Sequence, residues 1–220
     1  MSILFNEIEA RVLGCLIEKS FTTPDYYPLT LNALTNACNQ KSNRNPVMSL
    51  EETSVVRGLD DLRKKCMSEK VLKADSRVPK YQHLFMSQLS LSRGQAAVLC
   101  ELMLRGPQTG GEIRSRADRM NRFQDLNEVE EILSGLMEGD EPMVIKLPRR
   151  AGQKERRYMH LFYGQPEIED LEPPVGDESA TIRVIAENKR IEKLENELAL
   201  LRNEFNDLKK AFTDLKSQFE

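Results

Sequence analysis

The chain has 220 residues, of which 40% are hydrophobic and 30% charged, and its formal net charge is −3. This length and composition suffice for two small domains with modest cores. No apolar run approaches the roughly 18 residues of a membrane-spanning helix, and the N-terminal stretch MSILFNEIEARV is charged from Glu7 onward. We therefore expect a cytoplasmic protein with neither a transmembrane segment nor a signal peptide.

The charges are unevenly divided along the chain. Residues 1–86 carry 12 basic and 10 acidic side chains (net +2), residues 87–164 carry 12 and 11 (net +1), and residues 165–220 carry 8 and 14 (net −6). The acidic balance therefore belongs to the C-terminal part. The remainder is weakly basic, which permits nucleic-acid binding without requiring it.

Near the N-terminus, the spacing of Asn6 and Glu9 is that of a capping box, in which the two residues satisfy each other's backbone amides at a helix start. The helix that follows has an apolar face, formed by Ile8, Val12, Cys15 and Leu16. A shorter second helix fits residues 30–38. Ser49 and Glu52 have the spacing that starts a third helix.

A β-hairpin is expected after the third helix. Residues 71–85 (VLKADSRVPKYQHLF) place apolar strands on both sides of a polar tip that contains proline. Three helices followed by a hairpin are typical of a winged helix-turn-helix domain, with the hairpin as its wing.

The same order returns later in the chain. KYQHLF (80–85) recurs as RYMHLF (157–162), and VLGCL (12–16) recurs as VLCEL (98–102). From valine to tyrosine the first copy spans 69 residues and the second 60, so we place an insertion of about nine residues at 21–30. The period of 77 residues between the tyrosines suits a duplicated small domain rather than a solenoid.

The second copy has its own helix signals. Ser92 with Gln95 and Asp125 with Glu128 have capping-box spacing, and a short helix fits residues 110–117. A second wing is expected at 143–163. The predicted fold is α+β, mainly helical with small β-hairpins, and consists of two tandem winged helix-turn-helix domains at residues 1–86 and 87–164.

The two histidines, His83 and His160, occupy equivalent positions in the two hairpins. Because neither has a second histidine or a cysteine nearby, we favour packing over a ligand or switch role, which stays the alternative. The four cysteines form no CxxC pair, and we expect them to be reduced, small buried hydrophobes. We expect no metal site.

Residues 39–52 (NQKSNRNPVMSLEE), the YxHLF hairpin ends and the leucine-rich C-terminal segment together resemble the YceH-like family of bacterial proteins. The resemblance extends over essentially the whole chain. It implies two tandem winged-helix domains, and it implies no particular activity.

An acidic, proline-containing linker is predicted at residues 165–182, followed by a coiled-coil helix at 183–220. Apolar residues alternate by three and four along this helix and form the predicted dimerisation seam: Ile191, Leu194, Leu198, Leu201, Phe205, Leu208, Phe212 and Leu215. The flanking charges are opposite in sign for a parallel pair, as in Arg190 with Glu195, so we favour a parallel homodimer. A trimer and a helix packed on its own domains are the alternatives.

Motifs of catalysis and nucleotide binding are absent from the sequence. There is no GxGxxG, P-loop, GxSxG or HExxH pattern. Since both histidines have a structural explanation, no general base is evident, and we expect a protein that is not an enzyme and uses no cofactor.

Basic side chains gather at two kinds of place, between the second and third helices and in the second wing. These groups suit phosphate contacts with duplex DNA. The predicted DNA-binding residues are Lys41, Arg44, Arg116, Arg119, Arg122, Arg149, Arg150, Lys154, Arg156 and Arg157.

The third helices carry acids where DNA-binding domains of this type approach the bases: Glu51, Glu52, Glu128, Glu130 and Glu131. Carboxylates there repel phosphates, so two functions stay open. The first is a dimeric DNA-binding protein, such as a transcriptional regulator. The second is a tandem winged-helix adaptor that binds another protein, similar to the accessory proteins of bacterial chromosome condensation.

Overall fold

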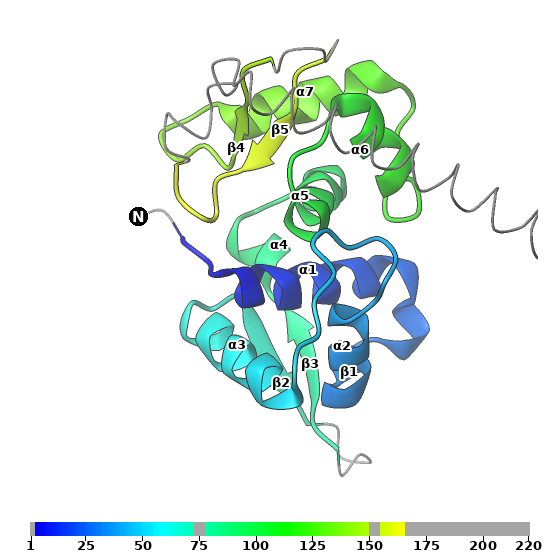
Figure 1. Ribbon diagram of the computed structural model, residues 1–220, viewed down its shortest axis with the longest axis vertical. Coiled ribbons are helices and arrows are strands. Elements are labelled where there is room, and N and C mark those ends of the chain that lie inside the picture. The colour runs from blue at the N-terminus through cyan, green and yellow to red at the C-terminus, as the bar shows by residue number, and fades with distance from the viewer. Residues whose placement is uncertain (1–2, 73–77, 150–154, 166–220) are drawn as a thin grey trace, which may run out of the picture. The chain divides into compact units, whose positions relative to one another are not determined.

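The computed structural model describes residues 3–72, 78–149 and 155–165 (Figure 1). The predicted coiled-coil helix and all but the first residue of the predicted linker lie outside these described residues. Residues 1–86 and 87–164 fall together in one compact unit. Among the described residues, no helix is long and apolar enough to cross a membrane.

The first half of the chain, residues 1–86, contains helices and one small antiparallel sheet. Its elements are α1 (Glu7–Thr22), η1 (Pro24–Tyr26), β1 (Leu29–Thr30), α2 (Leu31–Cys38), α3 (Glu52–Lys64), β2 (Ser68–Val71) and β3 (Lys80–His83), with α4 (Phe85–Gln88) at its end. The strands pair in the order β1-β3-β2. The predicted second helix is confirmed, and so is the hairpin, although its first strand begins three residues before the predicted start at Val71.

The second half, residues 87–164, repeats this order. It contains α5 (Arg93–Arg105), α6 (Gly110–Ala117), α7 (Leu126–Met137), β4 (Val144–Lys146) and β5 (Tyr158–His160), and β4 pairs antiparallel with β5. The chain is therefore a mixed helix and sheet protein, which agrees with the α+β prediction.

The repeated hexapeptide lies at the same place in both sheets. Tyr81 pairs with Leu29 in the first half, and Tyr158 forms an isolated bridge with Gln108 in the second. His83 lies opposite Ser68 of β2, as His160 lies opposite Val144 of β4. The duplication inferred from the hexapeptides thus extends to strand register.

The predicted insertion is only partly where the sequence placed it. The connection between α1 and α2 is longer than that between α5 and α6, and it holds η1 and β1. However, the α2–α3 connection (residues 39–51) is also longer than the α6–α7 connection (118–125). The extra residues of the first half are therefore divided between two connections.

Two predicted capping boxes are confirmed in full, those of Asn6 with Glu9 and of Ser92 with Gln95. The box predicted at Ser49 is wrong, because α3 begins at Glu52 without a side-chain cap.

The box predicted at Asp125 is half formed. The Asp125 carboxylate accepts from the Glu128 backbone N–H, whereas the Glu128 carboxylate accepts from the Gln124 N–H. The spacing therefore identified the start of α7, but it did not predict that the Glu128 carboxylate bonds Gln124 instead of Asp125.

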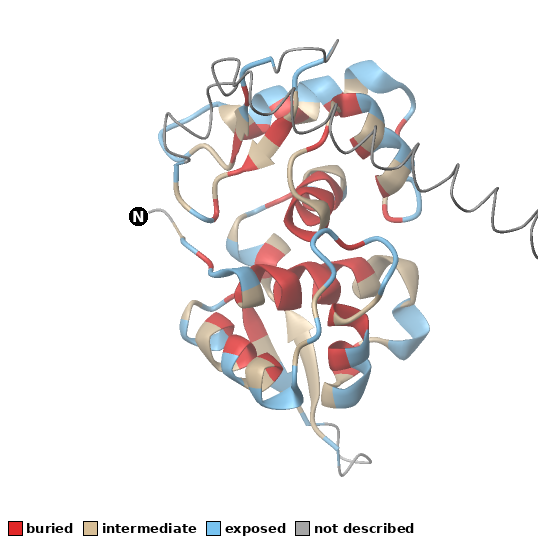
Figure 2. Cartoon of the chain, viewed as in Figure 1, coloured by how far each residue is buried: buried red, intermediate tan, exposed pale blue. Residues whose placement is uncertain are grey.

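Helices α1 and α5 form the centre of the core and pack against each other (Figure 2). The sequence predicted one apolar face for α1, yet residues 9–18 are all buried, because the second face meets α5. The helices approach closely at Gly14, where an added Cβ would lie 2.8 Å from Leu104 Cδ2. The Cys100 thiol donates to the Gly14 carbonyl over 3.2 Å. Gly14 and Cys100 occupy the same position of the repeat, so the halves meet through equivalent helices.

Candidate nucleic-acid interface

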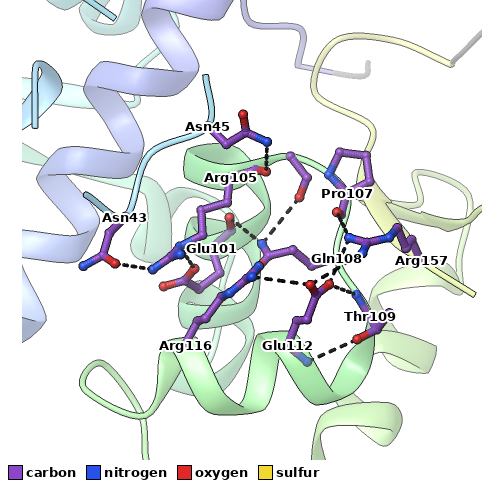
Figure 3. A network of polar contacts seen from close by, with 11 residues as sticks. Asn43, Asn45, Glu101, Arg105, Pro107, Gln108, Thr109, Glu112, Arg116 and Arg157 are labelled. Carbon is purple, nitrogen blue, oxygen red and sulfur yellow. Dashed lines mark hydrogen bonds and ion pairs between the residues drawn. The ribbon is translucent and has the colours of Figure 1, made fainter. Parts of the chain in front are cut away.

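The first turn of α6 is the centre of a polar network (Figure 3). Thr109 caps the helix by accepting from the Glu112 N–H, and the Glu112 carboxylate accepts from the Thr109 N–H over 2.9 Å. The same carboxylate accepts from Arg157 Nη1 at 2.9 Å and forms an ion pair with Arg116 at 3.3 Å. Thr109 and Glu112 have capping-box spacing, so this box could have been predicted from sequence and was missed.

The Glu112 carboxylate therefore pairs with two of the predicted DNA-binding residues, Arg116 and Arg157. Burial pushes the pKa of Glu112 up, but the Thr109 N–H and the charges of Arg157 and Arg116 outweigh it and hold that pKa below its ordinary value. Arg157 also donates to the Pro107 carbonyl over 2.8 Å, from β5 to the start of α6. Both arginines are half-buried, and through Glu112 they stabilise the contact between the start of β5 and α6.

A second group of arginines follows α6 and faces solvent. Arg119 and Arg122 are exposed, and neither has a hydrogen bond or ion pair to another described residue. Arg114 is exposed too, with one bond to the Gln124 carbonyl at 3.3 Å. Arg114, Asp118 and Arg122 line an open hollow of about 570 Å³ beside the start of α7. This part of the chain therefore presents three exposed arginines, with the exposed carboxylate of Asp118 among them.

The β4–β5 hairpin, which is the predicted second wing, is described only at its base. Arg149 and Arg156 are exposed there. Arg150 and Lys154 lie outside the described residues. On β4, the Lys146 ammonium lies 5.3 Å from the centre of the Tyr158 ring, a cation–π contact that holds it against the sheet.

In the first half, only one of the two predicted basic residues is at the surface. Lys41 is exposed, whereas the Arg44 side chain is 0% exposed and forms two hydrogen bonds with the Glu18 carboxylate, of 3.1 and 2.6 Å. It also donates to the Ala37 carbonyl at 3.0 Å. Burial pushes the pKa of Glu18 up, but Arg44 outweighs it and holds that pKa low. The predicted phosphate contact of Arg44 is at odds with this burial, and we leave Arg44 out of the candidate interface.

The acids of the third helices lie mainly at the surface. Glu51 and Glu52 at the start of α3 are exposed, as are Glu130 and Glu131 on α7. Glu128 differs, because its carboxylate is occupied by the Gln124 N–H at 2.6 Å. The exposed carboxylates make both third helices unfavourable for close approach to phosphates.

His83 and His160 are both packed in the structure. His83 Nε2 lies 3.1 Å from the Ser20 hydroxyl, and His160 Nδ1 accepts from the Phe162 N–H at 3.3 Å. Burial lowers the pKa of each to about 4, so both rings are neutral at pH 7. These contacts agree with the packing role predicted for them.

All four cysteines are free, as predicted. Cys15, Cys38 and Cys100 are buried, whereas Cys66 is exposed, contrary to the expectation of burial. Cys66 follows the end of α3 with a φ of 58°, where its side chain turns out of the core. Among the described residues, no three acidic, histidine or cysteine side chains gather closely enough to hold a metal ion.

Comparison with known families matches residues 5–153 to the family described as "Protein of unknown function, DUF480". UPF0502 proteins of Geotalea uraniireducens and Geobacter sulfurreducens are each 54% identical over 221 aligned residues, which cover 100% of both chains. One of Photobacterium profundum is 47% identical over 203 residues, 90% of this chain and 91% of its own. The chain belongs to the DUF480/UPF0502 family.

The DUF480 match includes every helix of the structure, from α1 to α7, and β4 of the second sheet. It therefore contains the buried Arg44, the Glu112 network up to Arg116, and the exposed Arg119 and Arg122. The matches to the UPF0502 proteins of Geotalea and Geobacter extend over residues 165–220 as well.

Proposed function

We propose that this DUF480 protein is a cytoplasmic, non-enzymatic DNA-binding protein built from two tandem winged helix-turn-helix domains, and that it acts as a regulator. One observation carries the proposal. Arg119 and Arg122 are exposed and have no partner among the described residues, and Arg122 lines the open hollow. An arginine without an internal partner supplies its full charge to a phosphate.

In this proposal the second half makes the main contact. The α6–α7 connection corresponds to the turn of a helix-turn-helix motif, and Arg114, Arg119 and Arg122 contact the phosphate backbone. The wing adds Arg149 and Arg156, with Arg150 and Lys154 at its tip. In the first half, Lys41 is the corresponding contact. Phosphate contacts position a protein on DNA without specifying bases, so binding is expected to depend weakly on sequence.

The salt dependence of binding tests this interface. Changing Arg119 and Arg122 together to alanine is expected to weaken binding to random duplex DNA. The slope of log affinity against log salt concentration should become shallower by roughly 2 units, because each lost phosphate contact removes about 0.9. The matched control is Arg63→Ala, because Arg63 is an exposed arginine on α3 already paired with Asp60 at 3.1 Å. Fluorescence anisotropy over a range of salt gives both quantities.

The wing is tested in the same assay. We expect a shallower slope, by roughly 3 to 4 units, when four arginines are changed together to alanine: Arg149, Arg150, Arg156 and Arg157. The loss of affinity should be the same for every DNA sequence. Since Arg157 also supports the wing through Glu112, the triple variant that keeps Arg157 serves as the control for folding. If the unmodified protein shows no salt-dependent binding at low ionic strength, DNA is not its ligand.

Dimerisation through residues 183–220 is the second part of the proposal. Its support is the apolar seam from Ile191 to Leu215, with opposite charges beside it. Deleting 183–220 is expected to leave a folded monomer, because the core of α1–α7 is complete among the described residues. Light scattering measures the mass, and an unchanged dimer after the deletion would contradict the seam.

The alternative function is a protein-binding adaptor of the same architecture. The exposed acids on the third helices favour it, namely Glu51, Glu52, Glu130 and Glu131. Glu130 and Glu131 changed to alanine are expected to leave DNA affinity equal or tighter if DNA is the ligand. The adaptor would be favoured by two results together: the protein does not bind DNA, and it captures a basic protein partner that the Glu130 and Glu131 variant no longer binds.

A further inference from the structure

A small pocket lies inside the compact unit, where both halves contribute to its wall. It has a volume of about 120 Å³ and is lined from α1, the α2–α3 connection, the end of α5 and the segment around β5. The connection is held to the second half by the Asn45 backbone N–H, which donates to the Leu104 carbonyl over 2.9 Å. Figure 3 shows a second link, in which Arg105 donates to the Asn43 side chain. The pocket is therefore built by tertiary contacts that join the halves.

Arg11 is the buried cation of this pocket. The residue is 2% exposed. Its guanidinium donates to the Cys38 carbonyl at 3.1 Å and to the Pro46 carbonyl at 2.5 Å. Its Nε is buried and has no hydrogen-bond partner among the described residues. No acidic group of the described residues lies within ion-pair distance of it.

A buried guanidinium without a counter-ion is costly, because burial removes its hydration and carbonyl groups replace only part of it. Among the described residues, the other buried arginine, Arg44, is neutralised by the Glu18 carboxylate at 2.6 Å. Arg11 has no such partner, although it lines a space that can hold one. The unsatisfied charge and the adjacent pocket together indicate a bound anion.

The remaining lining decides which anion fits. Pro46, Met48, Leu102 and Met103 contribute apolar groups, and the buried His160 ring is neutral at pH 7 because burial lowers its pKa to about 4. A phosphate or sulfate would meet this apolar surface with most of its oxygens and lose hydration there. A carboxylate with a short aliphatic chain matches both parts of the lining.

The size of the pocket limits the length of the chain. The pocket volume of about 120 Å³ is well above the roughly 10–15 Å³ that one water molecule needs, so the pocket has room for a small organic molecule. This volume suits a molecule of about five non-hydrogen atoms, such as propionate.

We propose that the pocket binds a short aliphatic carboxylate, with the carboxylate on the Arg11 guanidinium and the chain against Met48 and Met103. The ligand would contact α1, the α2–α3 connection and α5 at once, and would therefore stabilise the junction between the halves. The proposal does not depend on DNA binding. Glu7 also lines the pocket and is exposed, so its charge weakens binding of an anion.

The test is a titration of the ¹⁵N-labelled full chain with sodium propionate, followed by amide chemical shifts in NMR at constant ionic strength. Saturable shifts are expected at Asn45, Met48 and Gly106, with a dissociation constant on the order of 1 mM for so small a ligand. Propionamide has the same shape without the charge and is expected to bind at least about tenfold more weakly. Equal binding of the amide would overturn the role of Arg11.

Three variants test where the ligand binds. Met48→Trp fills the pocket from a half-buried position and is expected to abolish the shifts, while Glu7→Gln is expected to tighten binding about twofold to fivefold by removing the opposing charge. Arg11→Lys keeps the charge but loses the guanidinium fork, and about tenfold weaker binding is expected. Because Arg11→Lys can impair folding, Met48→Trp and the amide decide the question without it.

Two results would contradict the proposal. Shifts confined to the exposed Arg119 and Arg122, or unchanged by Met48→Trp, would show that propionate binds elsewhere. Saturable binding of inorganic phosphate at Asn45 and Met48 without binding of propionate would show that the assigned ligand class is wrong.

Discussion

The α2–α3 connection of the first half and the α6–α7 connection of the second occupy the same place in the repeat, yet they use arginine in opposite ways. Arg44 in the first is fully buried and holds Glu18 at 2.6 Å. Arg119 and Arg122 in the second are exposed and have no partner among the described residues. The same residue type therefore stabilises one half and charges the surface of the other.

The difference follows from one position on the preceding helix. Glu18 is the sixth residue after Val12, and the corresponding residue after Val98 is Leu104. The first half thus has a buried carboxylate that can neutralise an arginine, whereas the second half has an apolar side chain packed against Gly14. The carboxylate of Glu18 offsets the cost of burying Arg44, and the second half has no acid at the corresponding position.

The largest effect is expected from breaking the buried pair. Arg44→Met leaves the Glu18 carboxylate with Lys19, at 3.2 Å, as its only remaining cation among the described residues, and we expect a loss of about 3 kcal/mol in the free energy of unfolding. The double change Glu18→Leu with Arg44→Met is expected to recover most of this loss, because no unpaired charge remains. Urea unfolding measures both, and Lys41→Ala is the exposed control, expected within about 0.5 kcal/mol of the unmodified protein. If Arg44→Met alone is as stable as Lys41→Ala, the structural role of Arg44 is contradicted.

The histidines predict an acid sensitivity shared by the two halves. Burial lowers the pKa of His83 and His160 to about 4, below the value of about 6.5 in the unfolded chain, so the unfolded state binds protons first. Their stabilisation is fully present above pH 6.5 and is lost as the pH falls towards 4, by up to about 3 kcal/mol for each ring.

Urea unfolding between pH 7 and 4.5 measures this dependence. His83→Gln and His160→Gln are each expected to flatten it, while lowering the melting temperature at pH 7. Stability that falls equally steeply with and without the histidines would assign the acid sensitivity to other groups.

The close approach of α1 and α5 is expected to tolerate no side chain. Gly14→Val brings atoms into contact with Leu104 and is expected to destabilise the protein by about 1–3 kcal/mol through overpacking. Gly135 of α7 is the matched control, since an added Cβ there meets nothing within 4 Å, and Gly135→Val is expected to change stability by less than about 0.5 kcal/mol. Thermal unfolding compares the two. Equal effects would show that helix propensity, rather than the packing of the two halves, determines the outcome.

The smallest effect on stability is expected from the exposed arginines. Arg119→Ala and Arg122→Ala should each leave the free energy of unfolding within about 0.5 kcal/mol of the unmodified protein. Their effect should appear in the salt dependence of DNA binding instead. Urea unfolding that shows a larger loss would place these side chains in internal contacts, as with Arg44.

The sequence by itself determined the local structure of this protein. Capping residues and the alternation of apolar side chains act within a few residues of one another, and they placed the starts of α1 and α5 and both ends of α2 and α6 within a residue or two. The recurrence of YxHLF likewise predicted that His83 and His160 lie in matching registers. Where the local signal was ambiguous it misled, as at Ser49, because α3 begins without a side-chain cap.

Only the tertiary structure decided which charged groups are internal. Arg44 and Glu18 are 26 residues apart, and Arg157 meets Glu112 across 45 residues, so no local pattern distinguishes these arginines from Arg122. The burial of both faces of α1, and the pocket beside Arg11, arise because the two halves pack against each other. Hydrophobic burial and ion pairing depend on distance in space, whereas a sequence pattern reports distance along the chain.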